Sequence, residues 1–299
     1  MISSISILIP IFNDDGTRLV GSLVQQAQRI GGLDYEIVIY DDGSTDAHSI
    51  DACNRLCLLP HCRCVHATHS RCRAAMRNAM IGEAKHEWCL MVDARLEPRH
   101  HDFLQRYLSA PVGDAGAVCG GVVVDGGDDA EVLYTESLRF RYEKYEERHH
   151  SVAMRRQQPY RAFRTTNIMF RRSALQRVPY DESIVGYGYE DVMLGKCLQL
   201  AGIRVLHIDN PVAYTSFENN SRYLDKLEEA LRTLHAAAPQ LQGFSPLLAA
   251  INRLQGCHML WLVRCWHRLF GSLERRWLSG RRPSLLVLKI YKLGYYATL

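Results

Sequence analysis

Short apolar runs of strand type alternate with helix-like segments through the first third of the chain. The strand-like runs cover residues 5–10, 35–40, 62–67 and 87–93. Between them, residues 17–30 carry apolar side chains at helical spacing, and residues 73–84 form a second helix-like segment. This alternation predicts a parallel sheet with helices on both faces, and such sheets bind ligands at the carboxyl ends of their strands.

Polar residues follow three of these strand-like runs. Asn13 and Asp14 come after the first run, Asp41 and Asp42 after the second, and Asp93 after the fourth. Because the ends of parallel strands meet at one edge, we expect these side chains to gather there. A rim of acids suits the base and ribose hydroxyls of a nucleotide, or a metal ion. The alternative is that Asp41 and Asp42 only cap a helix and a turn.

Phosphate groups would have to be bound by side chains in this protein. Neither a G-x-G-x-x-G loop nor a G-x-x-x-x-G-K-[ST] loop follows the first strand. Arg73 and Arg77 lie four residues apart on one face of the predicted helix, with Asn78 beside them, and guanidinium groups pair well with phosphate oxygens. The alternative is that these arginines only cover a surface helix.

The second half of the chain has a different pattern. Residues 131–152 are typical of one polar, aromatic helix, and Asn167 opens an apolar strand. The segment GYGYED then places Glu190 and Asp191 at the predicted start of a helix. Capping of that helix could account for one acid. A general base would equally need a glycine-rich segment that delivers a carboxylate to a helix start.

The cysteines favour a reducing compartment. The chain has 10 cysteines, and its N-terminus reads directly into a strand without the charged region of a signal peptide, so we predict a cytoplasmic protein with mostly free thiols. One group could in principle hold zinc: Cys53, Cys57, His61, Cys62, Cys64, His66 and His69. Its spacing fits no common zinc finger, and we interpret its members as ordinary buried residues.

The end of the chain is basic and rich in large apolar residues. Residues 250–299 contain nine Arg or Lys and a single acid, Glu274, and residues 219–239 before them predict an amphipathic helix that packs on the preceding domain. Tryptophans among basic residues suit a helix that lies on an anionic membrane surface or holds a lipid-linked acceptor, and packing within a homodimer would use the same residues. No recognised nucleic-acid module is present, so nucleic acid is not an expected partner.

Five ordered blocks resemble the family 2 glycosyltransferases of the GT-A fold. The blocks cover residues 6–14, 35–46, 73–94, 165–175 and 180–212. The resemblance implies an α/β fold of GT-A type, with a nucleotide-binding mixed sheet flanked by helices over residues 1–217 and a basic helical extension over residues 218–299. It also implies an inverting transfer of sugar from a nucleoside diphosphate donor, commonly UDP, to a hydroxyl of a glycan or lipid-linked acceptor.

The family pattern also implies roles for single residues. Asp191 matches the catalytic base, with Glu190 beside it, and Asp93 matches the first acid of the family's Asp-x-Asp motif. The donor-binding residues implied are Pro10, Phe12, Asn13, Asp41, Asp42, Arg73, Arg77, Asp93 and Arg95. The acceptor or sugar pocket implied comprises Asn167, Gly188 and Tyr189.

The chain departs from the family pattern at the metal site. Arg95 stands where Asp-x-Asp has its last acid, and Tyr214 or Thr215 stands where a histidine often assists. Arg95 could neutralise the diphosphate without a metal. Asp93 or Glu97 could hold Mg²⁺ or Mn²⁺ together with the diphosphate and water. The third alternative is a nucleotide-sugar-binding pseudoenzyme or assembly scaffold with a degenerate metal site.

Overall fold

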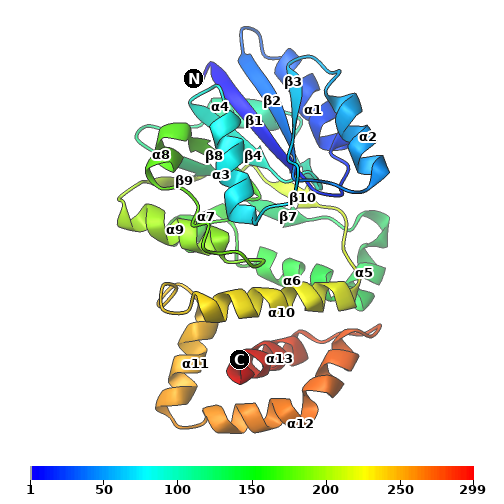
Figure 1. The fold of residues 1–299 in the computed structure, drawn as a ribbon, viewed down its shortest axis with the longest axis vertical. Coiled ribbons are helices and arrows are strands. Elements are labelled where there is room, and N and C mark those ends of the chain that lie inside the picture. Colours follow the sequence, from blue (N-terminus) through cyan, green and yellow to red (C-terminus); the bar gives the residue numbers. More distant parts are fainter. Residues whose placement is uncertain (1) are drawn as a thin grey trace.

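The computed structural model describes residues 2–299 and places a twisted seven-stranded sheet at its centre (Figure 1). The strand order is β3-β2-β1-β4-β8-β6-β9. Their bounds are β1 (Ser4–Ile11), β2 (Asp34–Asp41), β3 (Cys62–His66), β4 (Trp88–Val92), β6 (Ala117–Cys119), β8 (Asn167–Arg171) and β9 (Val205–His207). The first four strands of the chain are mutually parallel, as predicted, whereas β8 is antiparallel to both β4 and β6, which makes the sheet mixed.

Helices cover both faces of this sheet because its central strands are apolar on both sides. Ile5, Ile7 and Ile9 of β1 point into one core cluster, and Leu8 points into the other. The first cluster includes side chains of α1 (Thr17–Gln28), α2 (Ala47–Leu56) and α4 (Phe103–Leu108). The second includes side chains of α3 (Arg73–Glu83), α8 (Arg172–Arg177) and α9 (Glu190–Leu200).

A small three-stranded sheet lies beyond the end of β4. It pairs β10 (Val212–Tyr214) with β5 (Leu96–Pro98) and β7 (Val122–Val124). A short 3₁₀ turn (Gly127–Asp129) leads from it into the following helices.

The prediction of a single helix over residues 131–152 is wrong. The segment forms α5 (Ala130–Glu136) and α6 (Leu138–Glu147), and α7 (Val152–Gln157) begins after it. The break occurs at Ser137, whose extended backbone ends α5 and whose hydroxyl accepts a hydrogen bond from the N–H of Phe140 at the start of α6. Serine competes with helix continuation in this way, and apolar periodicity does not register it.

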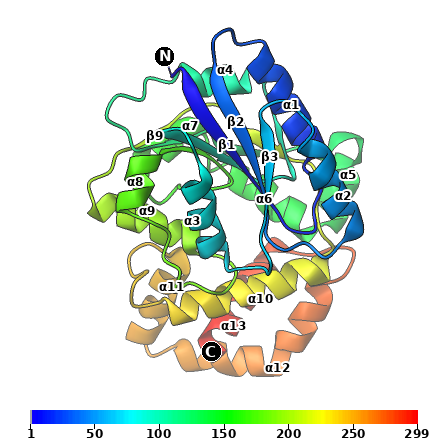
Figure 2. The same ribbon diagram turned by 45° about the horizontal axis from the view of Figure 1, so that its top comes forward.

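Four helices complete the chain, and α10 lies between the sheet region and the other three (Figures 1 and 2). They are α10 (Asn220–Ala236), α11 (Pro246–Gly256), α12 (Leu260–Leu278) and α13 (Leu285–Thr298). The predicted amphipathic helix over residues 219–239 is thus present as α10, and Leu231 and Leu234 on it share a core with Met193 of α9 and Tyr296 of α13. None of the helices in the described part of the chain has the length and apolarity required to cross a membrane.

Candidate functional site

The loops that follow β1 and β2 are tied to each other at the carboxyl edge of the sheet. Asn13, in a left-handed conformation with φ 50°, accepts hydrogen bonds at Oδ1 from the N–H groups of Thr45 and Asp46, at 2.8 and 3.0 Å. Its own N–H donates to Ser44 Oγ at 2.8 Å. Beside it, the ring of Phe12 is half exposed at this edge. The sequence therefore delivers an accessible aromatic ring to the position where a nucleotide base is expected.

Asp41 and Asp42 are buried and are held by the loops that follow β2 and β3. Asp41 Oδ1 accepts from the N–H of Ser44 at 2.9 Å, and Asp41 Oδ2 lies 3.1 Å from His66 Nδ1. Asp42 Oδ2 accepts from Ser70 Oγ at 2.8 Å. Burial opposes ionisation of Asp41, but the bonds from Ser44 and His66 outweigh it and lower its pKa, whereas burial prevails at Asp42 and raises its pKa. Both acids thus have a structural role, and their contact with a donor stays a prediction.

Glu190 stands at the centre of a buried ion cluster. Its Oε1 accepts a hydrogen bond from Arg77 Nη1 at 2.6 Å, and Arg73 Nε lies 3.1 Å from the same oxygen. The Nη2 atoms of Arg73 and Arg77 each lie 3.7 Å from a carboxylate oxygen of Asp93. Arg77 is 1% exposed and Glu190 is 5% exposed. One face of α3 therefore connects the end of β4 to the start of α9.

The two adjacent acids at the start of α9 have opposite pKa shifts. Burial alone would raise the pKa of Glu190, but the charges of Arg73 and Arg77 outweigh it and hold that pKa below its usual range. Burial and the nearby charge of Glu190 raise the pKa of Asp191 to about 6. A pair of carboxyl groups whose environments separate their pKa values can divide structural and proton-accepting roles between them.

The turn before α9 contains two consecutive residues with positive φ angles. Gly188 has φ +85°, and Tyr189, the residue that precedes the helix, has φ 67°. A Cβ atom on Gly186 would lie 2.3 Å from Thr233 Oγ1 of α10, so α10 packs directly against this turn. The glycines singled out in the sequence thus set the orientation in which Glu190 and Asp191 enter the helix.

Arg95 lines an open hollow of about 310 Å³ beside the end of β4. Its Nε donates to Asp14 Oδ2 at 2.5 Å, and about half of the Arg95 side chain is exposed. Glu97 lies in the same hollow, where its Oε1 is 3.4 Å from Arg18 Nη1. Arg95 and Glu97 therefore both face solvent, and each is paired with a residue of opposite charge.

The carboxylates predicted to hold a divalent metal lie beside arginines in this structure. Asp93 lies against Arg73 and Arg77, and Glu97 faces Arg18. Within residues 2–299, three potential metal ligands lie close together at a different place, at Cys53, Cys64 and His66. Because guanidinium groups repel a divalent cation at these distances, the surroundings of Asp93 do not fit Mg²⁺ or Mn²⁺. Tyr214, at the position of the assisting histidine, instead packs its ring 5.2 Å from the guanidinium of Arg139.

Asn167 is a structural residue rather than part of an open sugar pocket. It is 1% exposed; its Nδ2 donates to Gly121 O at 2.8 Å and Asn210 O at 2.9 Å, and its Oδ1 accepts from Tyr107 Oη at 2.7 Å. The cavity beside it has a volume of about 10 Å³, which is too small for a sugar. The amide of Asn167 is therefore not free for the expected sugar contact, because each of its hydrogen-bonding atoms already has a backbone or tyrosine partner.

Several residues that sequence reasoning missed surround the ion cluster. The ring of Tyr187 lies between two cations, with Arg73 at 5.3 Å and Lys226 at 5.8 Å from its centroid. Arg164, which pairs with Glu143 at 3.4 Å, is close enough to Asp191 to interact with its charge. A tyrosine in a glycine-rich turn and an arginine just before a strand carry no periodic signal. Only the fold brings Tyr187 to Arg73, and Arg164 close to Asp191.

The cysteines depart from the free-thiol prediction at one place. Eight are free, as expected, but Cys57 and Cys64 form a disulfide between the end of α2 and β3. The spacing of the neighbouring cysteines does not favour this pair, because the packing of α2 on β3 selects it.

Comparison with known proteins identifies the family. A family model described as glycosyl transferase family 2 matches residues 6–178. The chain belongs to this family. It is a glycosyltransferase with the GT-A type of fold, as the five sequence blocks predicted. No curated protein matches its sequence.

Solved structures share this fold at low sequence identity. A mannosyltransferase, PcManGT from Pyrobaculum calidifontis, in complex with GDP-Man and Mn²⁺, superimposes with a TM-score of 0.58 at 15% identity, over 98% of this chain and 84% of that one. TarS 1-349 of S. aureus gives a TM-score of 0.52 at 14% identity, over 99% and 90% of the two chains. The same protein in complex with UDP-GlcNAc gives 0.50 at 13% identity, over 96% and 78%. The GT-A neighbours thus include proteins that bind different nucleotide sugars.

The ion cluster yields a prediction about stability. Replacing Arg77 by Met should lower the free energy of unfolding by about 3–5 kcal/mol, because it leaves Glu190 buried with one cation fewer. The double variant Arg77→Met/Glu190→Gln should recover part of this loss, since it removes the unpaired charge. Urea unfolding followed by circular dichroism measures the free energy of unfolding of both variants. A decrease of less than about 1 kcal/mol in Arg77→Met would show that the Arg77–Glu190 pair is not essential for stability.

Proposed function

We propose that this glycosyltransferase inverts the anomeric configuration of its donor sugar and uses Asp191 as its general base. The observation that carries the proposal is the separation of the two acids at the start of α9. Glu190 is held ionised by Arg73 and Arg77, while burial and the charge of Glu190 raise the pKa of Asp191 to about 6. Asp191 is therefore ionised at neutral pH, yet is more basic than an ordinary aspartate.

In the proposed reaction Asp191 accepts the proton of the acceptor hydroxyl. The hydroxyl oxygen forms its bond to the anomeric carbon on the face opposite the leaving group, and the bond from that carbon to the diphosphate breaks. The nucleoside diphosphate leaves with the electron pair of that bond. Attack from the opposite face inverts the anomeric centre, and the charge that grows on the diphosphate needs electrostatic stabilisation.

We propose that arginines stabilise the leaving diphosphate. Arg73 and Arg95 are partly exposed at the carboxyl edge of the sheet, at the end of β4, and each can exchange its present carboxylate partner for phosphate oxygens. A guanidinium presents paired donors that match such oxygens and requires no additional ligand. This arrangement agrees with the poor fit of a metal ion near Asp93, and it favours the metal-independent alternative.

We propose a UDP-sugar as donor, with uracil near Phe12 and the ribose near Asp41 and Asp42. The support is the family's common use of UDP and the exposed ring of Phe12 at the sheet edge. A GDP-sugar is the main alternative, since PcManGT was solved with GDP-Man. The proposed acceptor is a glycan or a lipid-linked glycan, and Gly188 and Tyr189 stay proposed acceptor contacts because their turn leads directly to Asp191.

We also propose that residues 218–299 form a C-terminal extension that rests on an anionic membrane surface. One face of α12 exposes a stripe of large apolar residues at helical spacing: Leu262, Trp266, Leu269, Phe270, Leu273 and Trp277. Arg268 and Arg276 flank this stripe and are also exposed. An apolar face with tryptophans, bordered by arginines, suits the headgroup region of a bilayer, where a lipid-linked acceptor would be available.

The base assignment predicts the effect of one substitution. Asp191→Asn should reduce kcat about 100-fold or more, because an amide cannot accept the proton, while donor affinity stays within about twofold. The measurement is the turnover of UDP-sugars and GDP-sugars with glycan acceptors. NMR of the product gives its anomeric configuration. Asp51→Asn, an exposed acid on α2, is the matched control. Retained turnover in Asp191→Asn, or a product that keeps the donor's configuration, would contradict the proposal, and donor binding without any wild-type turnover would favour the scaffold alternative.

The role of Arg95 predicts insensitivity to chelators. Wild-type turnover should be unchanged by EDTA, and Arg95→Ala should weaken donor binding about tenfold or more, since a charge-assisted hydrogen bond contributes about 1.5–3 kcal/mol. Arg99→Ala, an exposed arginine paired with Asp125, is the control. Calorimetry of donor binding with EDTA, Mg²⁺ or Mn²⁺ measures the effect. Activity that disappears with EDTA and returns with Mn²⁺ would refute the metal-independent mechanism.

The membrane proposal predicts a charge-sensitive interaction with lipid. The full chain should sediment with vesicles containing anionic phospholipid and not with neutral vesicles, and Leu269→Asp/Leu273→Asp should reduce binding about tenfold or more. Ser272→Asp adds a negative charge beside the stripe and should have only a small effect on vesicle binding. A different result would identify the stripe as a subunit interface: wild-type protein that does not bind anionic vesicles but forms a dimer by light scattering, together with a double variant that stays monomeric.

A further inference from the structure

Four side chains with metal-ligating atoms converge where α2 packs against β3. Cys53 lies on α2, and Cys57 is the residue at its C-terminal end, one helical turn later. Cys64 and His66 are two residues apart on β3 and therefore point to the same face of that strand. Helix spacing of four and strand spacing of two thus bring three sulfur atoms and one imidazole together, although no common zinc-finger spacing is present.

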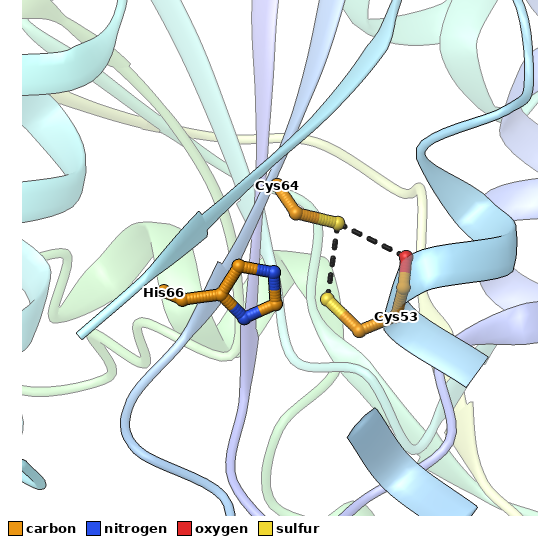
Figure 3. A group of neighbouring side chains, drawn as sticks. All are labelled: Cys53, Cys64 and His66. Carbon is orange, nitrogen blue, oxygen red and sulfur yellow. Dashed lines mark hydrogen bonds between the residues drawn. The ribbon is translucent and has the colours of Figure 1, made fainter. Parts of the chain in front are cut away.

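The sulfur atoms of Cys53 and Cys57 both contact that of Cys64. Cys53 Sγ lies 3.0 Å from Cys64 Sγ, and Cys64 is joined to Cys57. The ligating atoms of Cys53, Cys64 and His66 all lie within 4.8 Å of one another (Figure 3). A disulfide alone would require neither a third sulfur in contact with it nor an imidazole beside it.

The imidazole of His66 is oriented for coordination. Its Nδ1 lies 3.1 Å from Oδ2 of the buried Asp41, and this bond leaves Nε2 as the free nitrogen. The edge of the ring remote from Cβ faces the sulfur atoms of Cys53 and Cys64 (Figure 3). A carboxylate that bonds one nitrogen of a histidine while the other nitrogen binds metal is a recurrent arrangement at zinc sites.

We propose that the reduced protein binds one Zn²⁺ ion through Cys53, Cys57, Cys64 and His66, with Asp41 orienting His66. Three thiolates and one imidazole form a closed tetrahedral set of the kind that structural zinc sites use. Soft sulfur ligands favour zinc over Mg²⁺ or Mn²⁺, so this site is distinct from any metal at the donor diphosphate. Because His66 is exposed on one side, the ion can enter from solvent.

Zinc loading requires reduction of the disulfide first. A phosphine or dithiol reductant supplies two electrons to the Cys57–Cys64 disulfide, and two protons are taken up to give two thiols. Zn²⁺ then displaces one proton from each of the three thiols, and the neutral imidazole contributes its Nε2 electron pair. The disulfide in the structure therefore corresponds to the oxidised form, and a zinc complex to the reduced form of the same cluster.

Thiol–disulfide exchange is the competing explanation for three neighbouring cysteines. In that case Cys53 would attack Cys64 and release Cys57 as a thiol. Cys53 is completely buried in an apolar core, which disfavours the thiolate needed for such an attack. A metal ion, by contrast, deprotonates its thiol ligands outright, and exchange would leave the placement of His66 without a role.

Cobalt binding tests the proposal without reference to glycosyl transfer. The full chain, reduced anaerobically with a phosphine and freed of metal, should bind one Co²⁺ with thiolate-to-metal charge-transfer bands and tetrahedral visible absorption, and one Zn²⁺ should displace it. Cys53→Ser and His66→Ala should each weaken zinc affinity at least about tenfold, and Asp41→Asn about 10-fold or more through the orientation of His66. Cys62→Ser, on the same strand but outside the cluster, should bind as wild type does.

Circular dichroism and thermal melting of each metal-free variant show whether it is folded. Four results would overturn the proposal. The first three are the lack of a cobalt–thiolate spectrum in reduced protein, equal zinc affinity in wild type, Cys53→Ser and His66→Ala, and a Cys57–Cys64 disulfide that the phosphine cannot reduce in the folded chain. Cys53–Cys64 disulfide in peptide mapping, with no metal bound after reduction, would overturn it in favour of exchange.

Discussion

The buried ion pair between Arg77 and Glu190 connects the two halves of this glycosyltransferase. Arg77 lies on α3, in the parallel βα region, and Glu190 begins α9, 113 residues later. Both side chains are almost completely buried, so each charge needs partners of opposite sign, and the shortest such contact is the one between them. The pair therefore fixes where α9 starts relative to β4, and with it the position of Asp191 beside the carboxyl edge of the sheet.

The same charges determine the chemistry available at that edge. Arg73 and Arg77 keep Glu190 ionised, and the charge of Glu190 contributes to the raised pKa of Asp191. The two arginines also flank Asp93, and this makes the surroundings of that acid unsuitable for a divalent cation. One electrostatic arrangement thus raises the pKa of Asp191 and places two guanidinium groups beside Asp93. In the proposed mechanism, guanidinium groups take the position that a metal occupies in enzymes with an intact Asp-x-Asp motif.

Features that depend on local pattern could be predicted from the sequence. The apolar runs that form β1, β2 and β4 specify parallel strands because both of their faces are buried. The glycines at 186 and 188 mark the turn that leads to Glu190 and Asp191. The resemblance of five ordered blocks identified the family correctly.

Features that depend on distant contacts could not be predicted. Arg77 reaches Glu190 only through the packing of α3 against the segment before α9, so its role as a buried partner is invisible in its own helix. Asn167 begins a strand, as expected, but the carbonyl groups that occupy its amide come from residues 121 and 210. The disulfide between Cys57 and Cys64 and the third thiol beside it likewise depend on how α2 docks on β3. Sequence spacing alone does not contain that information.

The pH dependence of kcat/KM for wild type and Glu190→Gln tests the central claim, that the charge of Glu190 and its arginines sets the basicity of Asp191. Asp191 must be deprotonated to accept a proton, so wild-type kcat/KM should rise with pH through about 6 and level off above it. Removing the charge of Glu190 while Arg73 and Arg77 remain should lower the pKa of Asp191 and move this rise to lower pH. A rise at the same pH in both proteins, or no rise near pH 6 in wild type, would contradict the account.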